Sequence, residues 1–123
     1  MYLVGAAHPH KAESALALER AITSGERLVT DAEVLQEILH RYTAIDRRDA
    51  IQAAFDALLG LVDEVFAVDR AGVERAKELV YSHRRLSSRD ALHLALMERH
   101  GVREILSFDR GFDLIPGIRR LPA

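Results

Sequence analysis

The 123-residue sequence contains no cysteine and no long apolar run. Without cysteine the chain has neither disulfide bonds nor thiolate metal sites, which is typical of proteins in a reducing cytoplasm. Its apolar runs are far shorter than the roughly 20 residues that cross a bilayer. The first residues, Met1 to Gly5, also lack the basic flank and the long apolar core of a signal peptide. We therefore expect a cytoplasmic protein with no membrane partner.

A large excess of one charge is absent as well. The formal net charge is −2, and the 17 basic residues include only two lysines, Lys11 and Lys77. A balance this close to neutrality gives no overall basic surface for binding a nucleic-acid duplex. Short arginine clusters can still hold phosphates locally, although solvated helix ends are the simpler explanation for each. These clusters are Arg47-Arg48, Arg84-Arg85 with Arg89, and Arg119-Arg120.

The length predicts a single domain, and no linker, repeat or low-complexity tract interrupts it. Apolar periodicity predicts helices over 11–24, 48–61, 71–82 and 90–99, and another after a capping box formed by Thr30 and Glu33. Short strands are expected over 27–30, 64–68, 104–108 and 118–121. Strands that alternate with helices of ten or more residues predict a three-layer α/β/α sandwich with a mainly parallel sheet.

Three acidic residues fall where these elements begin or end. Asp90 opens a helix, Asp109 follows the strand 104–108, and Glu37 lies on the helix after the first capping box. Because ligands gather beyond the carboxyl ends of parallel strands, Asp109 is expected at the edge where a site would form.

Each acid also has a simpler explanation on its own. Ser87 and Asp90 fit a capping box, so that Asp90 alone is a structural residue. Asp109 begins a sequence that forms turns readily, and Glu37 fits the solvated face of its helix. The functional interpretation therefore depends on the three acids taken together.

Taken together, the acids have the order and spacing of one family. Ala91-Leu92-His93-Leu94-Ala95 follows Asp90, and Phe112 follows Asp109. With these features the sequence resembles the PIN-domain family and, within it, the ribonuclease toxins of VapC-type toxin–antitoxin pairs. The resemblance implies a PIN-like α/β fold and a Mg²⁺-dependent endoribonuclease in which Mn²⁺ can substitute. It also implies RNA as substrate and a cognate antitoxin as partner, and it leaves a homodimer open.

The resemblance further assigns roles to single residues. Glu37, Asp90 and Asp109 would be the catalytic and metal-binding acids, with Asp113 as an additional acid near the metal. Asp90 would bind the metal directly, whereas Glu37 and Asp109 would bind it through water or orient the attacking water. Mg²⁺ prefers oxygen ligands and uses a few carboxylates together with the substrate phosphate. The weaker candidates for substrate contacts are Ser107, Arg89 and Arg110.

The start of the sequence departs from the family pattern. Members begin with a short apolar strand that ends in Asp and leads into a first helix, and Met1-Tyr2-Leu3-Val4-Gly5 resembles that helix. No acidic residue precedes Glu13. The absent strand would lie near the centre of the sheet, where unpaired backbone groups are costly. We therefore predict that the domain, residues 1–123, is N-terminally truncated, lacks one direct metal ligand and has little activity as it stands. An upstream segment of roughly ten residues is expected to supply the strand.

Two other functions stay open at this point. The chain can be a degenerate PIN module that only binds an antitoxin or a second copy. A receiver-like phosphoacceptor domain also uses carboxylates and Mg²⁺, but it needs a lysine after a late strand, and neither Lys11 nor Lys77 follows a strand. The histidines of His8-Pro9-His10 have no Cys or further His at zinc spacing. His93, one turn after Asp90, is expected at a half-buried helix position.

Overall fold

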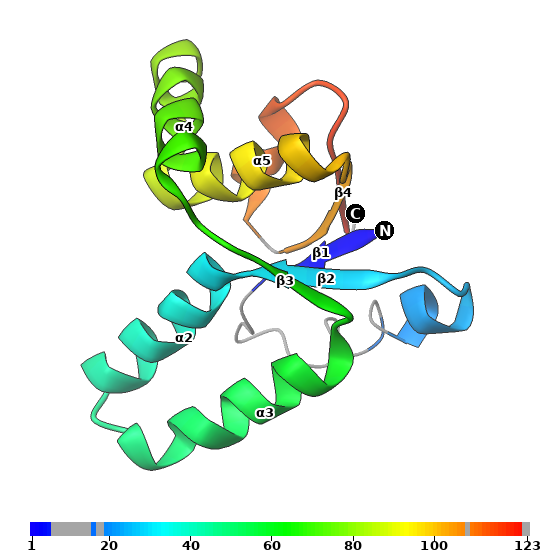
Figure 1. Ribbon diagram of the computed structural model, residues 1–123, viewed down its shortest axis with the longest axis vertical. Coiled ribbons are helices and arrows are strands. Elements are labelled where there is room, and N and C mark those ends of the chain that lie inside the picture. Colours follow the sequence, from blue (N-terminus) through cyan, green and yellow to red (C-terminus); the bar gives the residue numbers. More distant parts are fainter. Residues whose placement is uncertain (6–15, 17–18, 108, 122–123) are drawn as a thin grey trace.

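Five parallel strands form one sheet in the order β3-β2-β1-β4-β5 (Figure 1). The computed structural model describes residues 1–5, 16, 19–107 and 109–121. The strands are β1 (Tyr2–Val4), β2 (Leu28–Asp31), β3 (Glu64–Phe66), β4 (Glu104–Leu106) and β5 (Arg119–Leu121). Parallel neighbours require crossover connections, and this arrangement places all five carboxyl ends at the same edge of the sheet.

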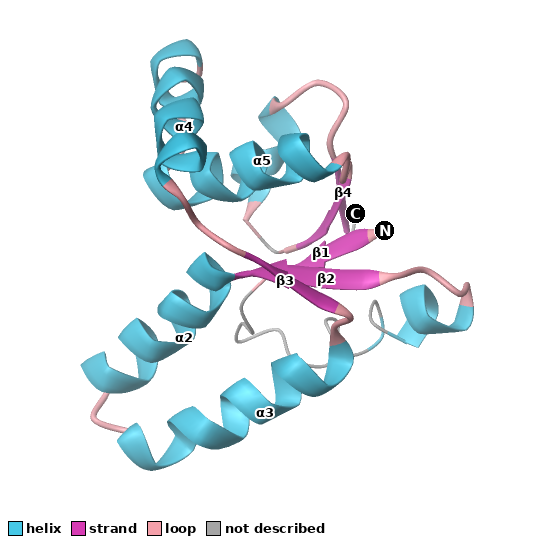
Figure 2. Ribbon diagram, in the orientation of Figure 1, coloured by secondary structure: helices cyan, strands magenta, loops and turns pink. Residues whose placement is uncertain are grey.

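Helices cover both faces of the sheet, as Figure 2 shows. They are α2 (Ala32–Ala44), α3 (Ile51–Leu61), α4 (Arg70–Ser82) and α5 (Ser88–His100), with short 3₁₀ helices η1 (Arg48–Ala50) and η2 (Arg110–Leu114). Helices α2 and α3 lie on one side, and α4 and α5 lie on the other. The predicted α/β sandwich is therefore confirmed, and its sheet is parallel throughout. Of the helix expected over 11–24, residues 19–23 are helical; His8-Pro9-His10 lies outside the described residues.

Alternating strand residues supply the two layers of the core. Leu3, Val29 and Ile105 pack with α4 and α5 in one hydrophobic cluster. Their neighbours along the chain, Val4, Leu28 and Leu106, pack with α2 and α3 in the other. Because successive side chains of a strand point to opposite faces, strands that are buried on both faces must be apolar throughout. No described helix is long and apolar enough to span a bilayer.

The first five residues correct an expectation. We expected Met1 to Gly5 to be helical and the central strand to be missing, but Tyr2–Val4 form β1 between β2 and β4. The physical reason is that the facing edges of β2 and β4 carry backbone groups that need partners, whereas an isolated short helix is only marginally stable. Gly5 follows β1, so this strand delivers no carboxylate to the edge. The expected segment before Met1 stays a prediction.

Helix α5 brings polar residues into the interior. Ser87 caps its start, and Gly101 ends it in the left-handed conformation (φ 68°), which favours glycine because it has no Cβ. The helix lies between the sheet and α4, so most of its middle is buried. Two of its buried residues, Asp90 and His93, are polar. Buried polar groups require hydrogen-bond partners, and the partners of these two define the candidate site.

Candidate functional site

Asp31 delivers the first carboxylate, at the carboxyl end of β2. Its side chain is fully buried, and its Oδ1 accepts a hydrogen bond from the Val34 amide (3.0 Å). Asp31 is thus the N-cap of α2, a position we had assigned to Thr30. Thr30 instead belongs to β2, and its hydroxyl donates to the Val4 carbonyl (2.8 Å). The second oxygen of Asp31 is left to face α5.

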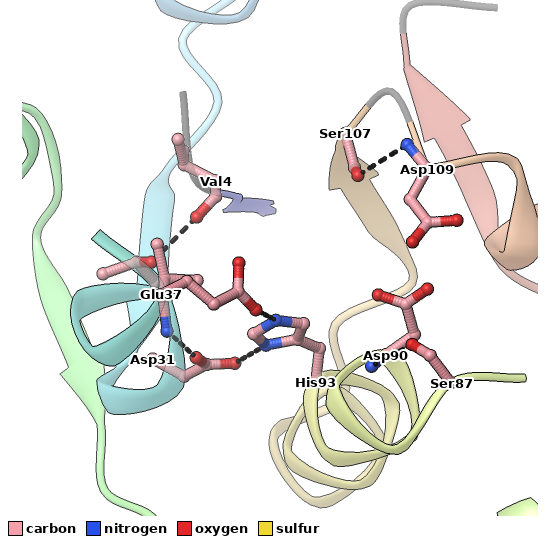
Figure 3. Close-up of polar contacts among 10 residues, drawn as sticks. Val4, Asp31, Glu37, Ser87, Asp90, His93, Ser107 and Asp109 are labelled. Carbon is pink, nitrogen blue, oxygen red and sulfur yellow. Dashed lines mark hydrogen bonds and ion pairs between the residues drawn. The ribbon is translucent and has the colours of Figure 1, made fainter. Parts of the chain in front are cut away.

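His93 of α5 fills the space between two carboxylates. Its Nδ1 lies 2.6 Å from Asp31 Oδ2, and its Nε2 lies 2.8 Å from Glu37 Oε1. Figure 3 shows the imidazole ring between the two acids. Burial lowers the pKa of His93, but the hydrogen bonds and charges of Asp31 and Glu37 outweigh it and raise the pKa to about 10. The ring is therefore charged at neutral pH, and both of its nitrogens donate.

Asp90 and Asp109 form a second group of acids, beside the start of α5 and the end of β4 (Figure 3). Asp90 lies in the first turn of α5, where its amide donates to Ser87 Oγ (3.1 Å). Asp109 follows β4 and caps η2, with its Oδ1 accepting from the Gly111 amide (2.9 Å). In Figure 3 the two carboxylates point toward each other. A Cβ added to Gly111 would lie 3.1 Å from Asp109 Oδ1 and 3.3 Å from Asp90 Oδ2, so the acids meet beside this glycine.

The electrostatics of Asp90 reflect this closeness. Burial raises its pKa, and so do the hydrogen bond and the negative charge of Asp109, whereas the charge of His93 opposes them. The resulting pKa of Asp90 is about 7. Ionising both carboxylates together is therefore unfavourable unless a cation or a proton lies between them.

The remaining predicted site residues differ in how they relate to this acid pair. Asp113 is bound by Arg120, with Nε 2.9 Å from Oδ1 and Nη2 3.2 Å from Oδ2. This partner lowers the pKa of Asp113. Ser107 Oγ accepts from the Asp109 amide (3.1 Å), and Arg110 is exposed beside it.

Arg89 is exposed in the first turn of α5. Together with Glu33 and Lys77 it lines a hollow of about 400 Å³ between α4, α5 and the start of α2. Neither Ser107, which follows β4, nor Arg110, which begins η2, lines this hollow.

The predicted acids are thus divided between two neighbouring groups. Asp90 and Asp109 face each other, whereas Glu37 is bound to His93, which lies one turn after Asp90 on α5. Within 1–5, 16, 19–107 and 109–121 no three His, Cys, Asp or Glu side chains are placed to hold one metal ion. The metal-binding and catalytic roles of Glu37, Asp90, Asp109 and Asp113 stay predictions.

Sequence reasoning missed Asp31 and undervalued His93. The signal for Asp31 was present, since an acid directly after an apolar strand is the same pattern that singled out Asp109. His93 had no comparable signal, because its two partners lie 62 and 56 residues away in the sequence. Only the packing of α2 beside α5 brings them together.

Comparison with known proteins agrees with this architecture. The model of the PIN domain family matches residues 1–118. Ribonuclease VapC13 of Mycobacterium tuberculosis and a VapC ribonuclease of Mycobacterium bovis are each 60% identical to the chain over 121 residues, which is 98% of the chain and 92% of each relative. Ribonuclease VapC23 of Mycobacterium tuberculosis is 38% identical over 109 residues, which is 89% of the chain and 86% of the relative.

Solved structures share the fold at low sequence identity. VapC20 of Mycobacterium tuberculosis, a Sarcin-Ricin loop cleaving toxin, has a TM-score of 0.66 at 23% identity and covers 89% of this chain and 91% of its own. VapBC2 of Rickettsia felis, bound to a DNA fragment from its promoter, has a TM-score of 0.68 at 12% identity and covers 97% and 96%. With a family model over nearly its whole length and relatives at 60% identity, the chain belongs to the PIN-domain family and is of the VapC type.

Proposed function

We propose that the protein is a metal-dependent endoribonuclease, the toxin of a VapC-type toxin–antitoxin pair. Relatives named as VapC ribonucleases, at 60% identity, support the reaction class. The observation that carries the proposal is the approach of Asp90 and Asp109 at the carboxyl edge of the sheet, where burial and the neighbouring Asp109 raise the pKa of Asp90 to about 7. Such an arrangement of acids is unfavourable in itself and becomes favourable when it binds a cation.

Mg²⁺ or Mn²⁺ fits this pair of acids. Mg²⁺ keeps several waters and is commonly held by one or two carboxylates together with substrate phosphates. Asp90 and Asp109 would hold the ion. When bound, it supplies positive charge to the scissile phosphate and eases the deprotonation of water.

The remaining residues of the chain would bind and orient the RNA. Glu37 would orient the attacking water, because Oε1 is bound to His93 and its other oxygen takes no part in that bond. Ser107 accepts from the Asp109 amide, which leaves its hydroxyl hydrogen for a phosphate oxygen. Arg110, exposed on the same loop, would contact the RNA backbone by charge.

An antitoxin protein is the expected partner. Two structures of similar fold are VapBC2 from Rickettsia felis and a toxin–antitoxin complex from Klebsiella pneumoniae, the latter with a TM-score of 0.59 at 15% identity. We propose by this likeness that the chain is neutralised by a cognate antitoxin in the cytoplasm. A homodimer stays a prediction that light scattering of the purified chain would check.

The test is cleavage of single-stranded and stem-loop RNA by the purified chain with Mg²⁺ or Mn²⁺. Asp90→Asn keeps the shape of the side chain and removes its charge, so we expect a loss of at least ~10²-fold in rate. The matched control is Asp46→Asn, because Asp46 is exposed in the loop after α2 and its positive φ of 55° suits asparagine. We expect this control to cleave like the parent.

Two results would contradict the proposal. Cleavage that survives both EDTA and Asp90→Asn would show that the acid pair is not the reactive site. A folded chain that binds an antitoxin peptide but cleaves no RNA at any metal concentration would instead favour the degenerate binding module.

A further inference from the structure

A buried chain of hydrogen bonds joins β2, α5 and α2 next to the acid pair. Asp31 is fully buried and His93 is 4% exposed, whereas the side chain of Glu37 is 19% exposed. The contacts run from the Val34 amide to Asp31, from Asp31 to His93, and from His93 to Glu37, at 3.0, 2.6 and 2.8 Å. The chain therefore begins in the core and ends on the acid that lies nearest to solvent.

Each member of the network limits the freedom of the next. Asp31 is fixed because one oxygen caps α2 while the other binds His93. The ring of His93 cannot turn without losing a bond at each nitrogen. Glu37 has a long side chain, and ordering such a side chain costs conformational entropy. A short bond from a charged donor offsets this cost, since charge-assisted hydrogen bonds are the strong ones.

We propose that Asp31 and His93 are positioning residues of the ribonuclease, which hold the carboxylate of Glu37 in one orientation beside Asp90 and Asp109. This inference rests on the proposed function for its effect on catalysis. The anchoring of Glu37 itself is a property of the free protein. Groups that hydrogen-bond a working carboxylate from behind fix its direction, and such support is commonly worth 10–100-fold in activity.

A purely structural role is the competing explanation, since the same contacts also link α2 to α5. The two explanations differ in what they expect of single variants. A structural link would lower the free energy of unfolding and leave the turnover of the folded fraction unchanged. A positioning role lowers kcat, and it does so only while Glu37 is present.

Two substitutions of His93 separate the two ends of the network. The amide nitrogen of asparagine occupies roughly the place of Nδ1, so His93→Asn keeps the bond to Asp31 and loses the bond to Glu37. The amide nitrogen of glutamine reaches the place of Nε2, so His93→Gln keeps the bond to Glu37. Asp31→Ser keeps a side-chain oxygen that caps α2 but loses the contact with His93.

The first measurement needs neither metal nor RNA. Side-chain three-bond couplings of Glu37, measured by NMR on the metal-free protein, report whether its χ angles are fixed or averaged. We expect fixed values in the parent, averaged values in His93→Asn, which loses the bond to Glu37, and intermediate averaging in His93→Gln and Asp31→Ser, which both leave that bond without its anchor at Asp31. Fixed values in all four proteins would overturn the proposal.

The second measurement is RNA cleavage under saturating Mn²⁺. We expect His93→Asn to lower kcat by at least about tenfold and His93→Gln and Asp31→Ser to lower it by a smaller factor, with KM changed by less than about threefold in each. In a Glu37→Gln background, His93→Asn should cause no further loss, because residues that act through one another are not additive. A matched stability control is Leu58→Val on the buried side of α3, which should unfold more easily and keep its kcat.

The outcomes separate this inference from the proposed function. If Asp90→Asn abolishes cleavage while His93→Asn and Asp31→Ser keep the parental kcat, the positioning role is wrong and the ribonuclease assignment stands. If the parent cleaves no RNA, the ribonuclease assignment fails, and the couplings of Glu37 still decide whether Asp31 and His93 hold it.

Discussion

Two groups of acids lie side by side at the edge of the sheet, and they differ in what faces the negative charges of their carboxylates. Asp31 and Glu37 have His93 between them, so each carboxylate faces a positive charge supplied by the chain. Asp90 and Asp109 instead face each other (Figure 3), and burial together with the hydrogen bond and charge of Asp109 raises the pKa of Asp90 to about 7, although the charge of His93 opposes this rise. In the first group the positive charge of His93 faces both acids, whereas the closeness of Asp90 and Asp109 favours the binding of a cation or a proton.

The two groups of acids therefore suit different roles: the network around His93 fixes geometry, and the pair of Asp90 and Asp109 favours a cation. A compensated network of buried charges fixes geometry, because breaking any bond exposes an unpaired charge to a low dielectric. Two carboxylates that face each other at close range repel when both are ionised, and binding a cation relieves this repulsion. Acids of identical chemistry at one sheet edge can therefore differ in role according to whether a histidine or a second acid faces them.

The largest effect is expected from breaking the compensated group. Asp31→Ala removes the N-cap of α2 and leaves His93 buried with one carboxylate instead of two. Removing one partner of a buried ion pair typically costs about 3–5 kcal/mol. Urea unfolding of the metal-free chain should show this loss in the free energy of unfolding.

The matched control for this prediction is Asp49→Ala. Asp49 pairs with Arg47 at the surface, where both side chains are mostly exposed, so little change is expected. Equal stability of the two alanine variants would mean that the buried network contributes no more than a surface ion pair.

The second prediction adds a third acid to the pair formed by Asp90 and Asp109. A segment of roughly ten residues before Met1, forming an apolar strand that ends in Asp, would compete with β1 for the place between β2 and β4. If it enters the sheet, its Asp lies beside Asp90 and Asp109, and the gain in cleavage should be at least ~10²-fold. An otherwise identical extension that ends in Asn isolates the carboxylate. Equal rates for the two extensions would show that the edge needs no further acid.

This competition explains why one part of the fold could not be predicted from the sequence. The strands 27–30, 64–68, 104–108 and 118–121 were predicted because apolar residues bounded by polar or turn residues have few alternatives. The segment Tyr2–Val4 is three residues long, and its apolar character suits a helix as well as a strand. Only the unpaired edges of β2 and β4, which are remote in the sequence, favour the strand.

The site was predicted in part, for similar reasons. Asp90 and Asp109 carry local signals, a capping serine before one and a strand before the other, and the structure brings them together. Glu37 was predicted as a member of the same cluster, but its carboxylate is bound by His93. The sequence does not reveal this contact, because it depends on how two helices cross and not on the spacing within either.

The third prediction concerns metal binding to the pair formed by Asp90 and Asp109. A ligand that binds only the folded state stabilises it by RT ln(1 + [L]/Kd), which is about 2 kcal/mol at roughly thirty times Kd. We expect Mn²⁺ to raise the melting temperature of the parent and of His93→Asn. Asp90→Asn should lose this response, since it removes one of the two proposed ligands. A rise that persists in Asp90→Asn would place the metal elsewhere.

The smallest effect is expected from pH, and it tests the pair without any metal. The pKa of Asp90 is about 7 in the folded chain and about 3.9 when unfolded. Between these values Asp90 binds more protons in the folded state than in the unfolded state, so its contribution to stability falls as pH rises from 4 to 7 and does not change above pH 7. Solvent reaches Asp109 and screens the pair, so we expect a loss of about 1–2 kcal/mol. Urea unfolding in EDTA should show this fall as the difference between the parent and Asp90→Asn, which cannot titrate, whereas Asp46→Asn should follow the parent. A difference of the opposite sign would mean that folding lowers the pKa of Asp90, and the contrast between the two groups of acids would be lost.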